Sequence, residues 1–420
     1  MLAIAVSGFW LYLGALDLLG IEPQTALTAG YYSVLATGLL LSAWAGRETI
    51  RRRLSTASRL PSAWALAAIA LAAWFLTNVA LLSSGVAARD AAVLLVVSSL
   101  PSAVVALSLT REQLRILGYA WVALAFGLLL VGVATLIASP TASGRFSPID
   151  ELDPITAAHV SALGVIVLLL VRFEDRRVRL AQAAGTALLV ALSVLPASRG
   201  ALVALAVAIL VVFLAVRRRM LPLLLPAVLF GLVLGGVGAS AIGADYYYSI
   251  DVPGLEGRVA PPAEGEDFTG EEVPALDGPP ISSLGVRRHL WTKALEDSID
   301  RPLFGHGVGM LVDDSPETLR MVRAGRIDAG ARTYPHNVLI ESFYSLGIVG
   351  LVLFLAVSTM SLMALWKLVR WRVERFASLL TLGFASFVGV NAMVSGEIGS
   401  DASLWVALAL PVALCADELL

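Results

Sequence analysis

Apolar segments long enough to cross a membrane recur along the whole chain, and they limit its fold more than any other feature. A helix needs about 20 mostly apolar residues to cross the hydrocarbon core of a bilayer. Backbone N–H and C=O groups find no water there, so such segments must satisfy them internally, as helices do. With 58% hydrophobic and 15% charged residues, the composition is also unlike that of a soluble domain. We therefore predict an all-α polytopic membrane protein.

The hydropathy of the chain predicts about twelve transmembrane helices of roughly 17–25 residues, some of them short. The first apolar segment has neither a basic beginning nor a small-residue cleavage site, so we interpret it as a retained span. The predicted spans are 2–19, 28–45, 61–83, 91–108, 117–138, 157–171, 181–196, 200–216, 221–242, 336–358, 377–395 and 403–418.

Arginine is distributed unevenly between the loops that join these spans. Five short loops on one side carry clusters of basic residues, whereas those on the other side hold only Arg89, Arg145 and Arg199. Basic residues accumulate in cytoplasmic loops, so we predict that both termini are cytoplasmic. The domains are then residues 1–242 with helices one to nine, 243–335 as one large extracytoplasmic loop, and 336–420 with helices ten to twelve.

The large loop has two parts. Residues 251–285 are rich in proline, glycine and acidic residues, which favours a solvated irregular segment over an acidic metal site. Residues 286–298 have apolar pairs four apart and are predicted to form a short amphipathic helix lying on the membrane or on other helices. Residues 315–326 are predicted as a second helix, with Ser315 as N-cap and Pro316 at its first position.

Charge, cysteine and histidine exclude several classes of function. The net charge of −2 gives no reason to expect nucleic acid as a partner, and the single Cys415 cannot form an intramolecular disulfide or a cysteine cluster. No two of the four histidines form a closely spaced pair, so we do not expect a metal site built on histidine. We also expect no cofactor. The four histidines are His159, His289, His306 and His336.

Three polar features lie on the predicted external side. Arg199, in the tight turn LPASRGA, either extends to the lipid headgroups or has a function, since ionisable residues at membrane depth often do. Arg287 and Arg288 open the loop helix, and their guanidinium groups match either anionic headgroups or a pyrophosphate. The sequence GHGVG at 305–309 is either an anion-binding nest of backbone amides or an ordinary glycine turn.

His336 begins the tenth predicted span. With Thr333 as N-cap and Pro335 in the first turn, His336 falls in the first helical turn, where the helix dipole lowers the pKa of an imidazole. A neutral imidazole near pH 7 suits a general base. Asn337 and Glu341, four apart on one face, are placed to orient it or a sugar hydroxyl. The alternative is a histidine that only caps the helix at the interface.

The chain resembles the O-antigen ligase and O-antigen polymerase superfamily at these residues. The matching stretches are SRGA at 198–201, RRHLWTKAL followed by DRPLFGHGVG within 287–309, and HNVLIESFYSLGIVG at 336–350. The resemblance implies a bacterial plasma-membrane (inner-membrane) glycosyltransferase of type-C architecture. Its donor would be a glycan on a polyprenyl pyrophosphate, its acceptor a glycan or lipid, and neither metal nor nucleotide sugar would take part.

The resemblance also implies roles for particular residues. Arg199 and Arg287 would bind the donor pyrophosphate; Arg287 is preferred over Arg288 because the family's arginine stands four residues before the tryptophan, here Trp291. His336 would deprotonate or orient the acceptor hydroxyl at the external face.

Arg145, in GRFSPIDELDPI, resembles an arginine of a second, weaker motif. In that motif an asparagine often follows Asp-Pro, and the present sequence departs from it with Ile155.

Three classes of function remain open. A ligase and a polymerase differ only in the acceptor. A flippase or transporter of lipid-linked oligosaccharide predicts charged residues in the middle of the spans and inverted repeats, whereas the polar residues here gather at the external ends. A non-catalytic assembly scaffold would use the His336 region only for packing.

Overall fold

The fold is described from a computed structural model of the 420-residue chain. The first predicted span, half of the second, the predicted helix at 315–326 and Arg145 lie outside the described residues. The described residues are 37–55, 59–83, 86–138, 154–171, 173–195, 198–216, 221–241, 283–312, 332–371 and 375–418.

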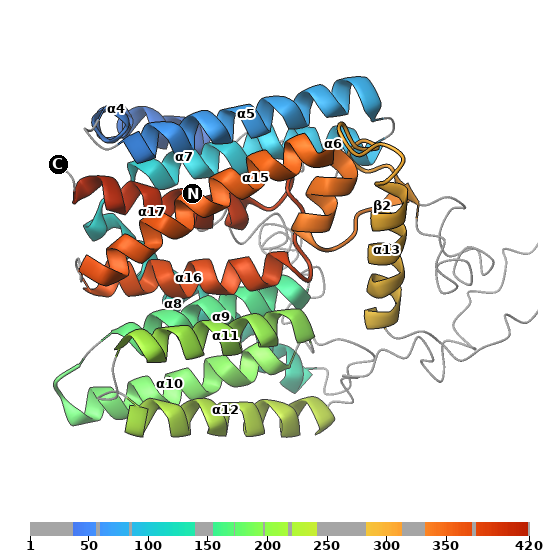
Figure 1. The fold of residues 1–420 in the computed structure, drawn as a ribbon. Coiled ribbons are helices and arrows are strands. Elements are labelled where there is room, and N and C mark those ends of the chain that lie inside the picture. The colour runs from blue at the N-terminus through green and yellow to red at the C-terminus, as the bar shows by residue number, and fades with distance from the viewer. Residues whose placement is uncertain are drawn as a thin grey trace, which may run out of the picture.

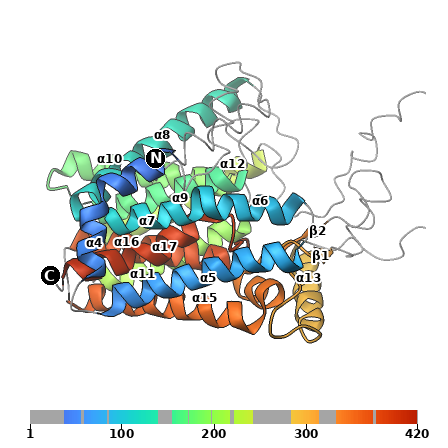
Figure 2. The same ribbon diagram turned by 90° about the horizontal axis from the view of Figure 1, so that it is seen from above.

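Helices form almost all of the described structure, and most of them run side by side in one bundle (Figure 1). The same arrangement seen from above places α17 and α9 among the other helices (Figure 2). The prediction of an all-α polytopic membrane protein is thereby confirmed. The helices of the bundle include α5 (Arg59–Leu82), α8 (Arg111–Ala138), α9 (Pro154–Leu170), α10 (Arg176–Val194), α11 (Arg199–Val216), α12 (Leu221–Ala241), α16 (Arg375–Ala392) and α17 (Ala402–Asp417).

Apolar helices occupy the positions of the third to the twelfth predicted spans. Among the described residues, six are long and apolar enough to cross a bilayer by length and composition, and shorter apolar helices include 156–170, 199–215, 224–238 and 402–417. The count of twelve stays a prediction, as does the orientation of the termini.

The core of the bundle centres on α17, whose residues from Ala402 to Ala416 are nearly all buried. A hydrogen-bonded chain crosses three helices in its interior. Trp64 Nε1 donates to Ser361 Oγ (2.9 Å), and Ser361 Oγ donates to the Leu408 carbonyl (2.6 Å). These bonds satisfy buried polar groups where no water is available, and they fix α5, α15 (Val338–Trp371) and α17 relative to one another.

Small residues allow α10 and α12 to approach closely. A Cβ atom added at Gly231 would lie 2.4 Å from the Ala187 carbonyl oxygen, and one at Gly235 would lie 2.9 Å from both the oxygen and the Cα of Ala191. Glycines four apart facing alanines four apart form the small-residue interface typical of membrane helices.

One end of the bundle is held by a buried arginine. Arg53, on α4 (Arg47–Leu54), is only 2% exposed and pairs with Asp417 at the end of α17 (2.6 Å). It also donates to the carbonyl oxygens of Leu107 and Leu109. In Figure 1 the C-terminus and α4 lie at the end opposite α13 (Ser283–Asp297) and β2 (Arg332–Thr333). Arg53 belongs to one of the basic short loops that are predicted to be cytoplasmic, and in the structure it connects α4, α17 and the 107–109 segment.

The opposite end carries a short helix and a minimal antiparallel sheet against α15 (Val338–Trp371). Helix α13 (Ser283–Asp297) begins three residues before the loop helix predicted over 286–298 and ends one residue before its predicted end. Its Leu290 and Ala294 are buried in a small cluster with Tyr344. Strand β1 (Leu311–Val312) pairs with β2 (Arg332–Thr333), with Leu311 opposite Thr333.

The tenth span differs from its prediction over 336–358. Helix α15 starts later, at Val338, and is interrupted at Gly347, whose backbone has φ 67° and ψ −170°. The Ile348 amide donates instead to the Pro302 carbonyl (2.8 Å), and Trp74 Nε1 donates to the Leu346 carbonyl (2.9 Å). The break separates a short first helix from the long helix that spans the bundle.

Candidate functional site

The candidate site is built on residues 334–337, here called the strap, which joins β2 to α15. Thr333 is not the N-cap of α15 as predicted, because it belongs to β2. Asn337 is the N-cap: its Oδ1 accepts from the amides of Leu339 (3.0 Å) and Ile340 (3.2 Å). His336, with φ 55°, therefore lies just before the helix and not in its first turn.

Two hydrogen bonds hold the strap from either side. Trp291 Nε1, on α13, donates to the Pro335 carbonyl (2.6 Å). Asn337 Nδ2 donates to the Met393 carbonyl (3.0 Å) in the turn that follows α16. The Tyr334 and His336 rings lie 4.3 Å apart between their centroids. Pro335 and Asn337, the chain neighbours of His336, are therefore both held by hydrogen bonds. The His336 imidazole itself is half-buried.

Helix geometry places Arg287 beside the strap. It stands one turn before Trp291, so the two side chains share one face of α13. Arg287 is half-buried and close enough to Tyr334 for its charge to lower the pKa of that phenol. Arg288 is exposed and points from a different side of the helix. Of the two predicted arginines, the structure brings Arg287 to the strap.

Three carboxyl groups lie close enough to Tyr334 for their charges to act on its phenol. Burial raises the pKa of Tyr334 most, and the charges of Glu397, Glu341 and Asp401 raise it further. Burial also raises the pKa of Glu397, against a hydrogen bond from Ser400 that lowers it. Tyr334 is consequently a neutral phenol that can both donate and accept a hydrogen bond.

Glu341 and Asn337, which are predicted to support the site, form hydrogen bonds with backbone groups of neighbouring segments. Glu341 is 1% exposed, and its Oε2 accepts from the Ile398 amide (3.1 Å) in the loop between α16 and α17. The Asn337 side chain is engaged by α15 and by Met393. Among the described residues, no group of three or more His, Cys, Asp and Glu has the arrangement that a metal ion requires.

Arg199 lies next to the 391–395 turn, which also contacts the strap. It is exposed at the start of α11, and a Cβ on the adjacent Gly200 would meet Val394 at 3.0 Å. The Asn337 bond to Met393 reaches the same turn. Arg199 and the strap therefore share this turn as their common support, while Arg145 lies outside the described residues.

His159 is a site neighbour that the sequence analysis missed. Its Nε2 lies 3.1 Å from Asn391 Oδ1, and its ring meets Phe387 edge-on at 5.3 Å. Asn391 begins the turn that carries Met393, since its carbonyl accepts from the amides of the 394–395 segment. Hydrogen bonds thus connect His159, through Asn391 and the turn, to Asn337.

The GHGVG segment is not an anion nest. The amides of Gly305, His306 and Gly307 donate to the carbonyls of Arg301 (2.9 Å), Tyr344 (2.8 Å) and Ser345 (3.1 Å). Gly305, Gly307 and Gly309 all have positive φ, which explains the choice of glycine. These three amides already have backbone partners. Two of the partners belong to the first part of α15, so the segment holds that part of the helix in place.

These features define a polytopic α-helical membrane protein with histidine, tyrosine and arginine gathered at one end of the helix bundle. Residues 184–355 match the family model described as O-antigen ligase. The match runs from α10 into α15 and includes Arg199, Arg287 and His336. It places this part of the chain in the O-antigen ligase and polymerase superfamily, which confirms the resemblance. No curated protein matches the sequence. Membership of this family indicates, in general terms, a membrane enzyme of polysaccharide biosynthesis with ligase- or polymerase-type activity.

Proposed function

We propose that the protein transfers a glycan from a polyprenyl-pyrophosphate donor to an acceptor hydroxyl at the external membrane face, with inversion and without a metal. The observation that carries the proposal is the meeting of α13 with the strap. Arg287 and Trp291 share the face of α13 that contacts the strap. There Trp291 donates to the Pro335 carbonyl, and Pro335 directly precedes His336. A fixed cation and an imidazole are thereby held at one end of the bundle.

Arg287 and Arg199 act on the leaving group. As the bond between the anomeric carbon and the pyrophosphate oxygen breaks, its electron pair passes to that oxygen. Guanidinium groups match phosphate oxygens with paired hydrogen bonds and keep their charge. Fixed cations stabilise the developing charge more than water does. Arg288, exposed on another side of α13, attracts the donor's headgroup region.

His336 acts on the acceptor. Its ring accepts the hydroxyl proton while the acceptor oxygen attacks the anomeric carbon opposite the leaving pyrophosphate, which inverts that centre. The N-terminus of α15 follows directly, and its partial positive charge favours the neutral imidazole that a base needs. Asn337, Glu341 and Trp291 support this role by fixing the strap and the loop after α16.

Replacement of His336 by alanine tests the base. We expect transfer from a lipid-linked glycan to fall by about 10²–10⁴-fold, as for loss of a general base. His289→Ala is the matched control, because it removes an imidazole from α13 two residues beyond Arg287, on another side of the helix. Folded His336→Ala protein with turnover near that of the wild type would exclude the base role.

The products distinguish the remaining alternatives. Purified protein is incubated with a polyprenyl-pyrophosphate oligosaccharide and candidate acceptors, and the products are identified by mass spectrometry. A new acceptor conjugate identifies a ligase, and longer lipid-linked chains identify a polymerase. Movement of lipid-linked oligosaccharide across vesicles without a covalent product would instead identify a flippase and refute the enzyme.

A further inference from the structure

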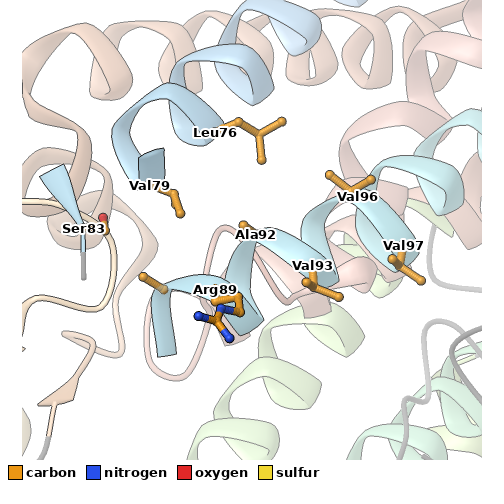
Figure 3. A pocket seen from close by; sticks show the side chains of 9 residues that line it. Leu76, Val79, Ser83, Arg89, Ala92, Val93, Val96 and Val97 are labelled. Carbon is orange, nitrogen blue, oxygen red and sulfur yellow. The ribbon is translucent and has the colours of Figure 1, made fainter. Parts of the chain in front are cut away.

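A groove of about 540 Å³ lies between α5 and α6 (Val86–Leu94), and no residue of the candidate site lines it. Leu76 and Val79 form one wall, and valine and alanine side chains of α6 and the turn after it form the other (Figure 3). Its volume is in the range of pockets that bind small molecules. The lining residues are Leu76, Val79, Ser83, Ala88, Arg89, Ala92, Val93, Val96 and Val97.

A single cation marks one end of this apolar groove. Arg89 is exposed near the start of α6, one turn before Val93. Arg89 forms no ion pair with another residue that the structure describes. Arg89 is also one of the few arginines in the predicted external short loops. The groove therefore offers a positive charge at the membrane surface and a lining of mainly apolar side chains below it.

A distortion of the helix shapes the inner part of the groove. Helix α6 continues through a π-helical turn (Leu95–Ser99) into α7 (Leu100–Ser108). Pro101 has no amide hydrogen to donate to the Val97 carbonyl, which accounts for the wider turn. Val96 and Val97 line the groove, while Ser99 Oγ donates inward to the Gly399 carbonyl (2.9 Å). Single π turns within helices occur frequently at functional sites.

The groove adjoins the elements that hold the candidate site. A Cβ on Gly399 would lie 3.1 Å from the Ala91 carbonyl of α6, and the preceding Ile398 amide donates to Glu341. At the outer end, a Cβ on Gly307 would lie 2.9 Å from Ser83 Oγ. Figures 1 and 2 both place the start of α6 at the same end of the molecule as β2 and α13.

We propose that this groove holds the part of the donor's isoprenoid chain nearest its phosphates, with Arg89 attracting those phosphates at the membrane surface. The proposal rests on the proposed function and adds a lipid site to it. From Arg89 to Val97 the helix rises about 12 Å, enough for the first part of a polyprenyl chain to lie along it. A pyrophosphate carries more negative charge than the phosphodiester of a phospholipid, so the arginine favours the polyprenyl donor.

Photo-crosslinking with a diazirine-bearing polyprenyl phosphate in vesicles tests this site. We expect labelled peptides from residues 86–97, and competition by unlabelled polyprenyl phosphate but not by phosphatidylglycerol. Val96→Trp fills the groove from its half-exposed rim and should lower labelling about tenfold, or about 1.4 kcal/mol. Leu130→Trp, on the exposed face of α8, is the matched control and should leave labelling unchanged. Arg89→Gln should weaken labelling by the phosphate probe.

Two results would overturn the proposal. One is equal competition by phosphatidylglycerol, which would make the groove an ordinary phospholipid contact. The other is Val96→Trp labelling equal to that of Leu130→Trp. The probe carries no glycan, so its labelling does not depend on transfer. Full labelling with no transfer refutes the proposed function alone, whereas full transfer by an unlabelled Val96→Trp protein refutes the groove alone.

Discussion

Replacement of Gly347 by alanine should destabilise the protein strongly. Its φ of 67° with ψ −170° is a conformation that essentially only glycine adopts, and forcing alanine into it costs about 1–3 kcal/mol. A Cβ would also lie 2.3 Å from the Leu303 carbonyl oxygen and 2.6 Å from the Phe304 amide nitrogen. Both are backbone atoms, so relief requires the 302–307 segment to move.

That movement would break the hydrogen bonds between the 302–307 segment and the first part of α15. The Ile348, His306 and Gly307 amides donate across this contact at 2.8, 2.8 and 3.1 Å, and each contributes about 0.5–1.5 kcal/mol. Together with the backbone strain, we expect Gly347→Ala to lose about 2.5–7.5 kcal/mol. Because the same segment positions α13, transfer activity should fall with stability.

Thermal unfolding in detergent micelles measures this effect, with Gly127→Ala as the matched control. Gly127 lies inside α8 with nothing within 4 Å of an added Cβ, so alanine there should be neutral or stabilise by up to about 1 kcal/mol. The expected result is a much lower Tm for Gly347→Ala and an unchanged or higher one for Gly127→Ala. Equal Tm values for the two variants would refute the reasoning.

Three further predictions concern the two ends of the bundle. Arg53→Gln should cost about 3–5 kcal/mol, because it leaves the Asp417 carboxylate without its buried partner; a Tm within error of the wild type would contradict this. The raised pKa of Glu397 means that its stabilising contribution is complete below its ordinary value of 4.5 and is lost as pH rises through the raised pKa. Glu397→Gln should therefore match the wild-type Tm near pH 4 and exceed it increasingly toward pH 8, whereas parallel curves would argue against it. His159→Ala should lower kcat about ten- to a hundredfold by loosening the turn at Asn391, and His159→Gln, which can still donate to Asn391 Oδ1, should restore most of it; failure of that rescue would show that the hydrogen bond does not position the site.

Hydropathy predicts the helices well because lipid and helix geometry act on every residue alike. Predicted boundaries such as 377–395 and 403–418 differ from α16 and α17 by one to three residues. The spacing of Arg287 and Trp291 likewise predicts a shared face of α13, since residues four apart are neighbours on any helix. These features depend on local sequence, and local sequence is sufficient to find them.

The details of the site depend on contacts between segments far apart in the chain. Gly347 lies in an apolar stretch that reads as a continuous span, and its break is imposed by Pro302 and Leu303. Thr333 and Asn337 are both good N-cap residues, and pairing of β2 with β1 removes the first from the helix. His159 stands 232 residues before Asn391, so no spacing rule connects them.

The backbone of His336 gives the strongest structural reason to assign it a chemical role. Among the residues that the structure describes, it is the one non-glycine with positive φ, a conformation that costs a residue with a Cβ about 1–3 kcal/mol. Glycine would hold the same strap without that strain, and would still leave Trp291 bonded to Pro335 and Asn337 bonded to Met393. A histidine used only for capping gains nothing here, because Asn337 is already the N-cap of α15. His336→Gly should therefore keep or raise the Tm while abolishing transfer, and a lower Tm with transfer intact would show that the imidazole serves the fold instead.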